Sequence, residues 1–352
     1  MAKVYFLPVE KINQLETFLV KAGLPEIFSP GDNVALKIHF GSSGHDHHVL
    51  PELVAPIVSL VRSRKASPFL TDTNVLYRGE RDTTFSHLEV AWSHGYHHLA
   101  PIVIAGSFRG DDEVVVRLPG ENKRPAYLAR EFSHFKALVA VTHFKGHLLS
   151  GIGGTIKNIG MGCASRKGKF AMHASVQPQV TLAQCTGCGR CVQNCPAQAI
   201  TLVKKKASID RDRCFGCAQC VHVCPEEAID IPWSSTSSVQ FQERLAFYAA
   251  AVHSLYPEKF FAVNFLLKIA PNCDCLRNPG EPMVPDIGVL ASSDPVAIDQ
   301  ASVYLVKETP GAKWGAGVDK FQQVWPACPY WKQLEAAEKL GLGSRQFQIE
   351  SF

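Results

Sequence analysis

The sequence predicts an α/β domain with a mostly parallel sheet, interrupted by a small cysteine-rich domain. Apolar runs typical of buried strands alternate with segments of helical periodicity, a pattern that favours a doubly wound sheet. Eight of the twelve cysteines fall in two tight groups in the middle of the chain. The alternating pattern resumes after them, so we expect residues 1–178 and 234–352 to form one discontinuous domain around an insertion at 179–233.

The strands and helices of the larger domain can be placed from these runs. The predicted strands before the insertion cover residues 33–40, 67–72, 101–105 and 137–144. The predicted helices lie around residues 50–61 and 85–94. After the insertion we expect a helix at 241–253, a strand at 260–269 and a further helix that begins at Asp294 and Pro295, where the carboxylate caps the first turn.

Composition excludes several classes of function. The 352 residues are 46% hydrophobic and 19% charged, which is typical of a soluble globular protein with a large core. A formal net charge of +4 is too small to indicate nucleic-acid binding. No apolar run resembles a signal peptide or reaches the ~18 residues of a membrane span, so we expect a cytoplasmic protein that binds no membrane. Grouped cysteines in a reducing compartment indicate metal binding.

The two cysteine groups are copies of one motif. Each follows the pattern C-x2-C-x2-C-x3-C-P, and the second group starts at residue 214, which is 29 residues after residue 185. Ile200 and Ile229 keep the same offset and should shield whatever the cysteines bind. The basic run between the motifs predicts a hairpin turn at Lys204, Lys205 and Lys206. The region is therefore an internal duplication.

This spacing suits two 4Fe–4S clusters. Three cysteines at i, i+3 and i+6 wrap one cube, while the cysteine before the proline points away and binds the neighbouring cube. We assign the first cluster to Cys185, Cys188, Cys191 and Cys224. We assign the second cluster to Cys214, Cys217, Cys220 and Cys195. Two zinc sites are the alternative that this spacing leaves open. Residues 179–232 resemble the bacterial two-cluster 4Fe–4S ferredoxins.

Polar side chains follow several predicted strands at their carboxyl ends, where open α/β sheets bind ligands. Asp72 and Asn74 follow one of these strands. The candidates for catalysis at the other strand ends are Lys37, His39, His143, Lys145 and His147. The last three alternate along the chain, so in an extended segment they share one face. Taken singly, each is weak evidence for a site, but their common placement predicts one.

A glycine-rich stretch follows these residues. Backbone N–H groups at a helix start, together with a lysine, could bind a phosphate or carboxylate. The residues that would hold such an anion are Gly151, Gly153, Gly154, Thr155, Lys157 and Asn158. A structural glycine turn explains the same residues equally well.

Two further features of the sequence are candidates for the site. Cys273 and Cys275 can face one ligand and, with His143 or His147, could hold zinc or iron as a third metal site. A pair of buried thiols is the alternative. Asp299 lies one turn into the last predicted helix, so we expect it to pair with a buried lysine and contribute to catalysis.

Several stretches together resemble a known family. Residues 145–169, the NCDC run at 272–275 and residues 285–299, combined with a ferredoxin insertion, are similar to uncharacterised iron–sulfur centre proteins, a domain-of-unknown-function family. The resemblance implies the fold and the clusters and supplies no reaction.

We therefore expect an iron–sulfur redox protein, an oxidoreductase whose reaction the sequence does not specify. Its two 4Fe–4S clusters would pass single electrons to or from a ligand pocket in the α/β domain. The partners would be an electron donor or acceptor protein and a small anionic substrate. The alternatives are a non-catalytic electron carrier or cofactor-assembly partner that docks to another protein, and a redox sensor.

Overall fold

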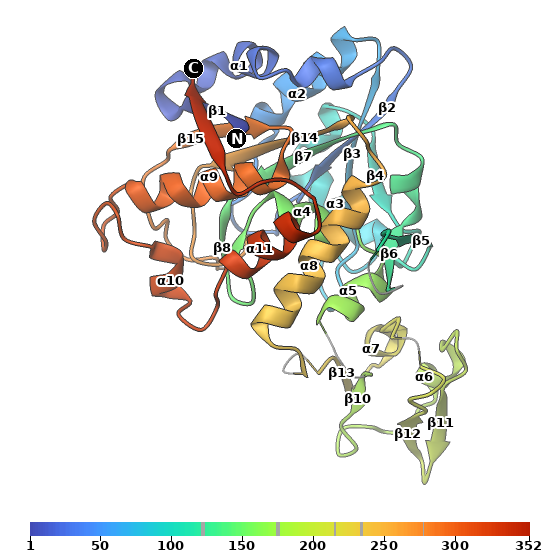
Figure 1. Ribbon diagram of the computed structural model, residues 1–352. Helices are drawn as coiled ribbons and strands as arrows, with labels where there is room; N and C mark the ends of the chain where they lie inside the picture. The colour runs from blue at the N-terminus through green and yellow to red at the C-terminus, as the bar shows by residue number, and fades with distance from the viewer. Residues whose placement is uncertain (121–123, 174–176, 215, 233–234, 277) are drawn as a thin grey trace.

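An eight-stranded mixed sheet forms the centre of the computed structural model, which describes residues 1–120, 124–173, 177–214, 216–232, 235–276 and 278–352 (Figure 1). The strand order is β16-β1-β15-β14-β7-β2-β3-β4. Strands β14, β7, β2, β3 and β4 run parallel, whereas β15 is antiparallel to both of its neighbours. The bounds are β1 Ala2–Pro8, β2 Asn33–Ile38, β3 Ser67–Thr73, β4 Ile102–Ala105, β7 Ala137–His143, β14 Phe260–Leu266, β15 Gly288–Ser292 and β16 Phe347–Ser351.

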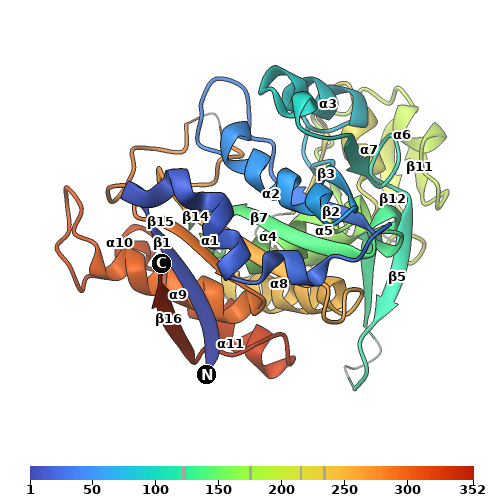
Figure 2. The same cartoon turned by 90° about the horizontal axis from the view of Figure 1, so that it is seen from above.

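Helices cover both faces of this sheet because its central strands are apolar on both sides (Figure 2). Along β7, Leu138 and Ala140 face one hydrophobic core while Val139 and Val141 face the other. The helices of the second face are α1 Leu15–Lys21, α2 Pro51–Ser63 and α3 Thr84–Ser93. Those of the first face are α4 Thr155–Gly162, α5 Arg166–His173, α8 Ser238–His253, α9 Pro295–Glu308 and α11 Trp331–Lys339. Helix α10 spans Lys320–Val324.

The prediction of an α/β domain with a mostly parallel sheet is confirmed. The predicted strands and helices lie within a few residues of β2, β3, β4, β7, β14, α2, α3 and α8. Asp294 caps α9, where its side chain accepts hydrogen bonds from the backbone N–H groups of Val296 and Ala297. The antiparallel pairing of β15 with β1 was not predicted, because the two strands come from opposite ends of the chain and their pairing leaves no local signal.

Short hairpins complete the domain. They consist of β5 Glu113–Arg117 with β6 Pro125–Ala129, and β8 Lys145–His147 with β9 Gly151–Gly153. Among the described residues, no helix is both long and apolar enough to cross a membrane.

Residues 179–232 form a small lobe below the sheet domain (Figure 1). Its elements are β10 Gln179–Val180, α6 Arg190–Gln193, β11 Ile200–Val203, β12 Lys206–Ile209, α7 Gln219–Val223 and β13 Ile229–Asp230. Strand β10 pairs with β13, so the two ends of the lobe lie side by side. Lys204 and Lys205 both have a positive φ and form the turn between β11 and β12. Helices α6 and α7 follow Gly189 and Ala218, both left-handed, which preserves the 29-residue repeat in the backbone.

Candidate functional site

Two small cavities in the lobe are lined by the eight motif cysteines. The first cavity contains Cys185, Cys188, Cys191 and Cys224. The second contains Cys195, Cys214, Cys217 and Cys220. Each cavity therefore combines three cysteines of one motif with the last cysteine of the other. This grouping matches the predicted assignment, in which the last cysteine of each motif joins the cluster of the other motif. That the cavities hold iron and sulfide stays a prediction.

The surroundings of these sulfurs fit iron–sulfur clusters. The backbone N–H of Ala199 donates to Cys195 Sγ and that of Ala228 donates to Cys224 Sγ, both at 3.3 Å. Such hydrogen bonds stabilise the thiolate charge that a cluster requires. Ile229 lines the first cavity and Ile200 the second, which excludes water from both. In the described part of the chain, no three His, Cys, Asp or Glu side chains are grouped so that they could hold a metal ion. A cubane spreads its four thiolates over four irons, so its ligands do not converge on one ion.

A larger cavity of about 480 Å³ lies at the carboxyl ends of β2, β3 and β7. Parallel strands end at the same edge of a sheet, which is why polar residues far apart in the sequence meet here. The predicted residues that line it are Lys37, His39, Asp72, His143, Lys145, His147, Gly153, Gly154, Lys157, Asn158, Cys273 and Cys275. Asn74 does not line this cavity, because its amide faces Thr84 and the carbonyl of Phe108.

Lys37 is held in an ion pair. Its Nζ lies 2.9 Å from Asp72 Oδ1 and donates to Asn158 Oδ1 at 2.8 Å. Although burial raises the pKa of Asp72, Lys37 and the neighbouring histidines lower it well below its usual range. A Cβ at Gly162 would lie 2.5 Å from Lys37 Nζ, so a glycine at this end of α4 makes room for the lysine.

Asp274, between the two cysteines of the NCDC run, is the second anionic centre of the cavity and was not among the predicted site residues. Its Oδ2 lies 3.1 Å from Lys145 Nζ, 3.4 Å from His143 Nδ1 and 3.7 Å from His39 Nδ1. Burial raises the pKa of Asp274, but these three side chains hold it well below its usual range. The other ring nitrogen of His143 lies 2.8 Å from the carbonyl of Leu267, so both nitrogens of this ring face acceptors.

Arg81 also belongs to the cavity and was not predicted. Its guanidinium lies 2.5 Å from His39 Nε2 and donates to Tyr77 Oη at 3.2 Å. Burial lowers the pKa of His39 well below its usual range, despite the nearby Asp274. His39 is therefore neutral at pH 7; its Nε2 faces the guanidinium and its Nδ1 faces the backbone N–H of Gly41 at 3.0 Å.

Cys273 and Cys275 share one negative charge. The pKa of Cys275 is lowered to about 6, first by a hydrogen bond from Cys273 and then by Lys157 and Arg81, whereas the pKa of Cys273 is raised. Lys157 Nζ lies 3.8 Å from Cys273 Sγ. At pH 7 the pair is thus a thiolate beside a thiol, in contact with cations.

The third metal site expected at these two sulfurs lacks histidine ligands in the described residues. His143 is engaged by Asp274 and Leu267, and His147 Nδ1 lies 2.9 Å from Ser150 Oγ. No third ligand from a described histidine or acid completes a group around the sulfurs. Cys273 is buried and Cys275 is half-buried at the cavity wall, and a metal ion at these two sulfurs stays a prediction.

The glycine-rich stretch needs a correction. Asp299 accepts hydrogen bonds from the backbone N–H groups of Thr155 at 2.7 Å and Ile156 at 2.9 Å, so the start of α4 is already occupied by a carboxylate of the protein. A Cβ at Gly154 would collide with Asp299. Gly151 packs against Tyr330 and shapes a turn. The predicted anion cradle is thus a structural cap, although Lys157 and Asn158 do line the cavity.

Asp299 itself was expected to pair with a lysine, and this prediction was wrong. Its carboxylate faces α4 and the amide of Asn264, at 2.8 Å, and does not line the cavity. Burial raises the pKa of Asp299 to about 6, while the two backbone N–H groups and Asn264 lower it. The residue fastens α9 to the start of α4.

Helix α5 supplies two cavity residues that sequence reasoning missed, Lys169 and His173. Lys169 is 5% exposed and donates to Thr73 Oγ1. Burial lowers the pKa of Lys169 to about 7, and the nearby Lys37 lowers it further while Asp72 opposes this. A short basic helix is typical of a solvated face, so no local signal could have placed this lysine inside.

Comparison with known proteins identifies a family and a distant structural likeness. Residues 34–304 match the family described as Domain of unknown function (DUF362). The lactate racemase apoprotein from Thermoanaerobacterium thermosaccharolyticum is similar at 14% sequence identity, with a TM-score of 0.42. The aligned region covers 88% of this chain and 58% of that chain, so this chain spans less than two thirds of that protein. No match was found among curated proteins.

Proposed function

The chain belongs to the DUF362 family, and we propose that it is an iron–sulfur oxidoreductase whose α/β cavity binds the molecule that is reduced or oxidised. Cys185, Cys188, Cys191 and Cys224 would hold one 4Fe–4S cluster, and Cys195, Cys214, Cys217 and Cys220 the other. When bound, these clusters would supply or accept single electrons. The remaining residues bind the ligand, exclude water and handle protons.

One observation carries this proposal: helix α5 contacts the cysteine loop that lines the second cysteine cavity and also lines the large cavity. The ring of Phe170 packs against the cysteine loop at Gly216. The contact is so close that a Cβ added at Gly216 would lie 2.7 Å from Phe170 Cδ1. Its neighbours Lys169 and His173 line the large cavity instead. One helix therefore contacts both regions, which supports electron transfer between them.

The loop before α3 forms the second part of this wall. Leu76 lines the large cavity and also packs in the same apolar core as Cys220. Arg166, which is 2% exposed, fixes the loop to α5 by donating to the carbonyl oxygens of Val75 and Asp82. Arg78 donates to the carbonyl of His222 in α7 at 2.9 Å, which joins the loop to the lobe.

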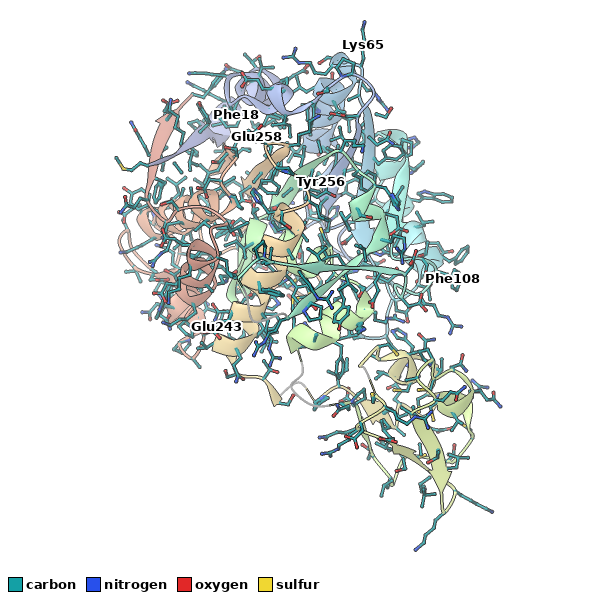
Figure 3. All side chains as sticks on the ribbon, turned by 45° about the vertical axis from the view of Figure 1, so that its right-hand side comes forward. Phe18, Lys65, Phe108, Glu243, Tyr256 and Glu258 are labelled. Atoms are coloured by element: carbon teal, nitrogen blue, oxygen red, sulfur yellow. The ribbon has the colours of Figure 1, made fainter. Side chains whose placement is uncertain are left out.

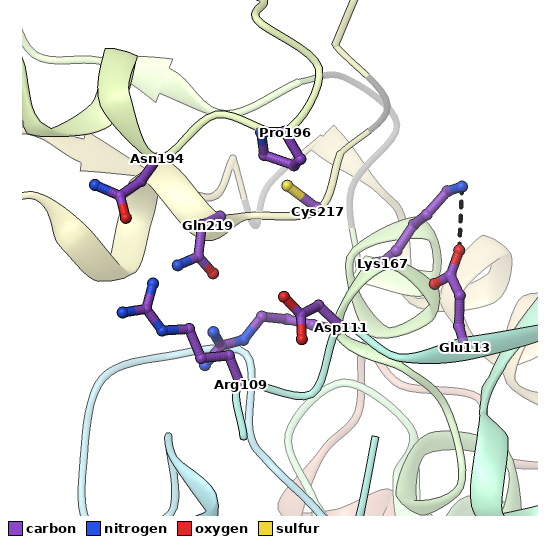
Figure 4. A pocket seen from close by; sticks show the side chains of 9 residues that line it. Arg109, Asp111, Glu113, Lys167, Asn194, Pro196, Cys217 and Gln219 are labelled. Atoms are coloured by element: carbon purple, nitrogen blue, oxygen red, sulfur yellow. Dashed lines mark hydrogen bonds and ion pairs between the residues drawn. The ribbon is translucent and has the colours of Figure 1, made fainter. Parts of the chain in front are cut away.

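A cleft of about 360 Å³ marks the rest of the boundary between lobe and sheet domain (Figure 4). In Figure 4, Cys217 and Pro196 of the lobe lie across from Arg109 and Asp111 of the sheet domain. Contact through charged and apolar residues on several elements supports a fixed position of the second cysteine cavity beside the large cavity.

The lysines of the cavity have two roles in such a reaction, charge stabilisation and proton transfer. Adding an electron to a bound molecule adds negative charge, which the ammonium groups of Lys145 and Lys157 offset in a site of low polarity. Lys169 Nζ has a pKa of about 7 because of burial, so it can give or take the proton that accompanies the electron. Lys37 and Lys145 are held in place by their ion pairs with Asp72 and Asp274.

Metal content is the first test. Protein prepared without oxygen should contain about eight irons and about eight acid-labile sulfides per chain. The replacement C220S should lower both numbers to about four, while C163S, at a buried cysteine outside the motifs, should leave them unchanged. Zinc without sulfide would contradict the proposal.

Electron transfer to the cavity is the second test. Chemically reduced protein is mixed with a panel of aliphatic and aromatic organic acids, and reoxidation is followed by visible absorption. We expect at least one acid to reoxidise the protein, and K145M and K157M to slow this about tenfold or more at unchanged iron content. If no acid reacts and a flavodoxin oxidises all variants equally fast, the chain is an electron carrier.

A further inference from the structure

The large cavity has an excess of positive charge. Its cationic lining residues are Lys37, Arg81, Lys145, Lys157 and Lys169. Its carboxylates are Asp72 and Asp274. Five cations against two carboxylates leave an excess of three, which the thiolate of Cys275 and partial deprotonation of Lys169 reduce without cancelling.

Only two of these cations are neutralised by carboxylates in the described residues. Lys37 pairs with Asp72 and Lys145 pairs with Asp274. For Arg81, Lys157 and Lys169, no described carboxylate lies at ion-pair distance. Arg81 is 3% exposed and Lys169 is 5% exposed, so neither can be fully hydrated. A buried cation without a counter-charge is costly, and an anion in the cavity would offset that cost.

Lys157 is the central member of these three. The pKa of Cys275 is lowered by its hydrogen bond from Cys273 and then by both Lys157 and Arg81. The pKa of His173 is lowered by burial and then by both Lys157 and Lys169. Lys157 therefore acts on one residue together with Arg81 and on another together with Lys169, and all three cations line the same cavity.

The remaining lining is mostly apolar. Met161 and Phe241 line the interior. Leu148, Leu276 and Tyr77 also line the cavity and are 45%, 39% and 39% exposed, so they lie where it opens to solvent. A small hydrated ion would leave these apolar surfaces in contact with water, whereas a ligand with an apolar body would cover them.

We infer that the cavity binds an amphipathic organic anion, with a carboxylate or phosphate head at Arg81, Lys157 and Lys169 and an apolar body against Leu148 and Leu276. The anion would be the substrate of the proposed redox reaction, and only this role as substrate rests on the proposed function. Binding itself requires no electron transfer.

The test is calorimetric titration of oxidised protein with matched probes. Octanoate and octyl phosphate carry the head and the tail, octanol and octylamine carry the tail without the negative charge, and acetate and inorganic phosphate carry the head alone. We expect one of the two amphipathic anions to bind about tenfold or more tightly than every other class of probe. Whether octanoate or octyl phosphate binds more tightly distinguishes a carboxylate head group from a phosphate head group. Equal binding of octanol and octanoate would overturn the inference.

Two variants locate the head group. K157M and K169M keep the length of the side chain and remove its charge, and each should weaken binding of the amphipathic anion about tenfold. K65M is the matched control, because Lys65 is exposed on the far side of the sheet domain (Figure 3). Unchanged affinity in both cavity variants would overturn the placement of the head. If the amphipathic anions bind but no acid in the reoxidation test oxidises the reduced clusters, the redox function is refuted and this site stays intact.

Discussion

Individual side chains of the cavity are positioned by charges that come from distant parts of the sequence. Asp274 orients Lys145 and His143 from a loop that follows β14, and Asp72 orients Lys37 from the neighbouring strand. Each carboxylate fixes a cation that would otherwise be costly to bury. Lys169 lacks such a carboxylate in the described residues, and this difference has a measurable consequence.

Lys169→Met should stabilise the protein most at low pH. Burial lowers the pKa of Lys169 from 10.5 to about 7, so the folded state is penalised below pH 7 and the penalty fades as pH rises towards 10.5. We expect the melting temperature of K169M to exceed that of the wild type at about pH 6.5 and the difference to shrink at about pH 9. K65M serves as the control. A pH-independent difference would contradict the burial of a titrating amine.

Asp299→Asn tests a structural role against a catalytic one. The amide keeps the shape of the side chain but replaces one acceptor of the two backbone N–H groups in α4. We expect a loss of about 1–3 kcal/mol in the free energy of unfolding, with normal iron content and normal binding of octanoate. Normal stability with abolished binding would favour the predicted catalytic role over the structural one.

At the scale of elements, the two cysteine motifs are interlocked by the 29-residue repeat. Helices α6 and α7 each begin after a left-handed residue, and the backbone beyond each proline turns back so that Ala199 and Ala228 reach Cys195 and Cys224. This geometry directs the last sulfur of each motif to the other cavity, and the exchange can be tested by pairs of substitutions.

The double variant C195S/C214S should retain about four irons, because both cysteines line the second cavity and the first remains complete. The double variant C195S/C185S should retain almost none, because it damages both cavities. Iron and sulfide analysis of anaerobic protein distinguishes the two. If each motif bound its own cluster, the results of the two variants would be interchanged.

For the whole molecule, the placement of the lobe beside α5 links the two sites. The second cysteine cavity touches the sheet domain through Phe170, whereas the first lies near the exposed hairpin residue Leu202. Cys188 of the first cavity is exposed, so this end of the lobe is accessible to an electron-donor protein. Electrons would then enter at one end of the lobe and leave at the other.

Phe170→Ala should change the midpoint potential of one cluster and leave the other unchanged. Removing the ring admits water beside the second cysteine cavity, and exposure to solvent is one of the factors that set cluster potentials. Leu202→Ala should shift the other cluster instead. Redox titrations followed by electron paramagnetic resonance separate the two signals. A shift of both signals in F170A would mean that this ring does not belong to one cluster alone.

The sequence by itself determined the features that depend on local spacing. The cysteine repeats predicted the grouping of eight sulfurs, the apolar runs predicted the parallel strands, and Asp294 with Pro295 predicted the start of α9. Polar residues at strand ends predicted the place of the cavity, because parallel strands share one carboxyl edge.

Only the tertiary structure decided which side chains act together. Arg81, Lys169 and Asp274 enter the cavity from three separate segments, and Asp299 caps α4 across the core. These contacts join residues far apart in the chain, and a single sequence contains no record of which distant charges meet. Burial, which moves the pKa of Lys169 towards neutrality and leaves the cavity cationic, exists only once the helices cover the sheet.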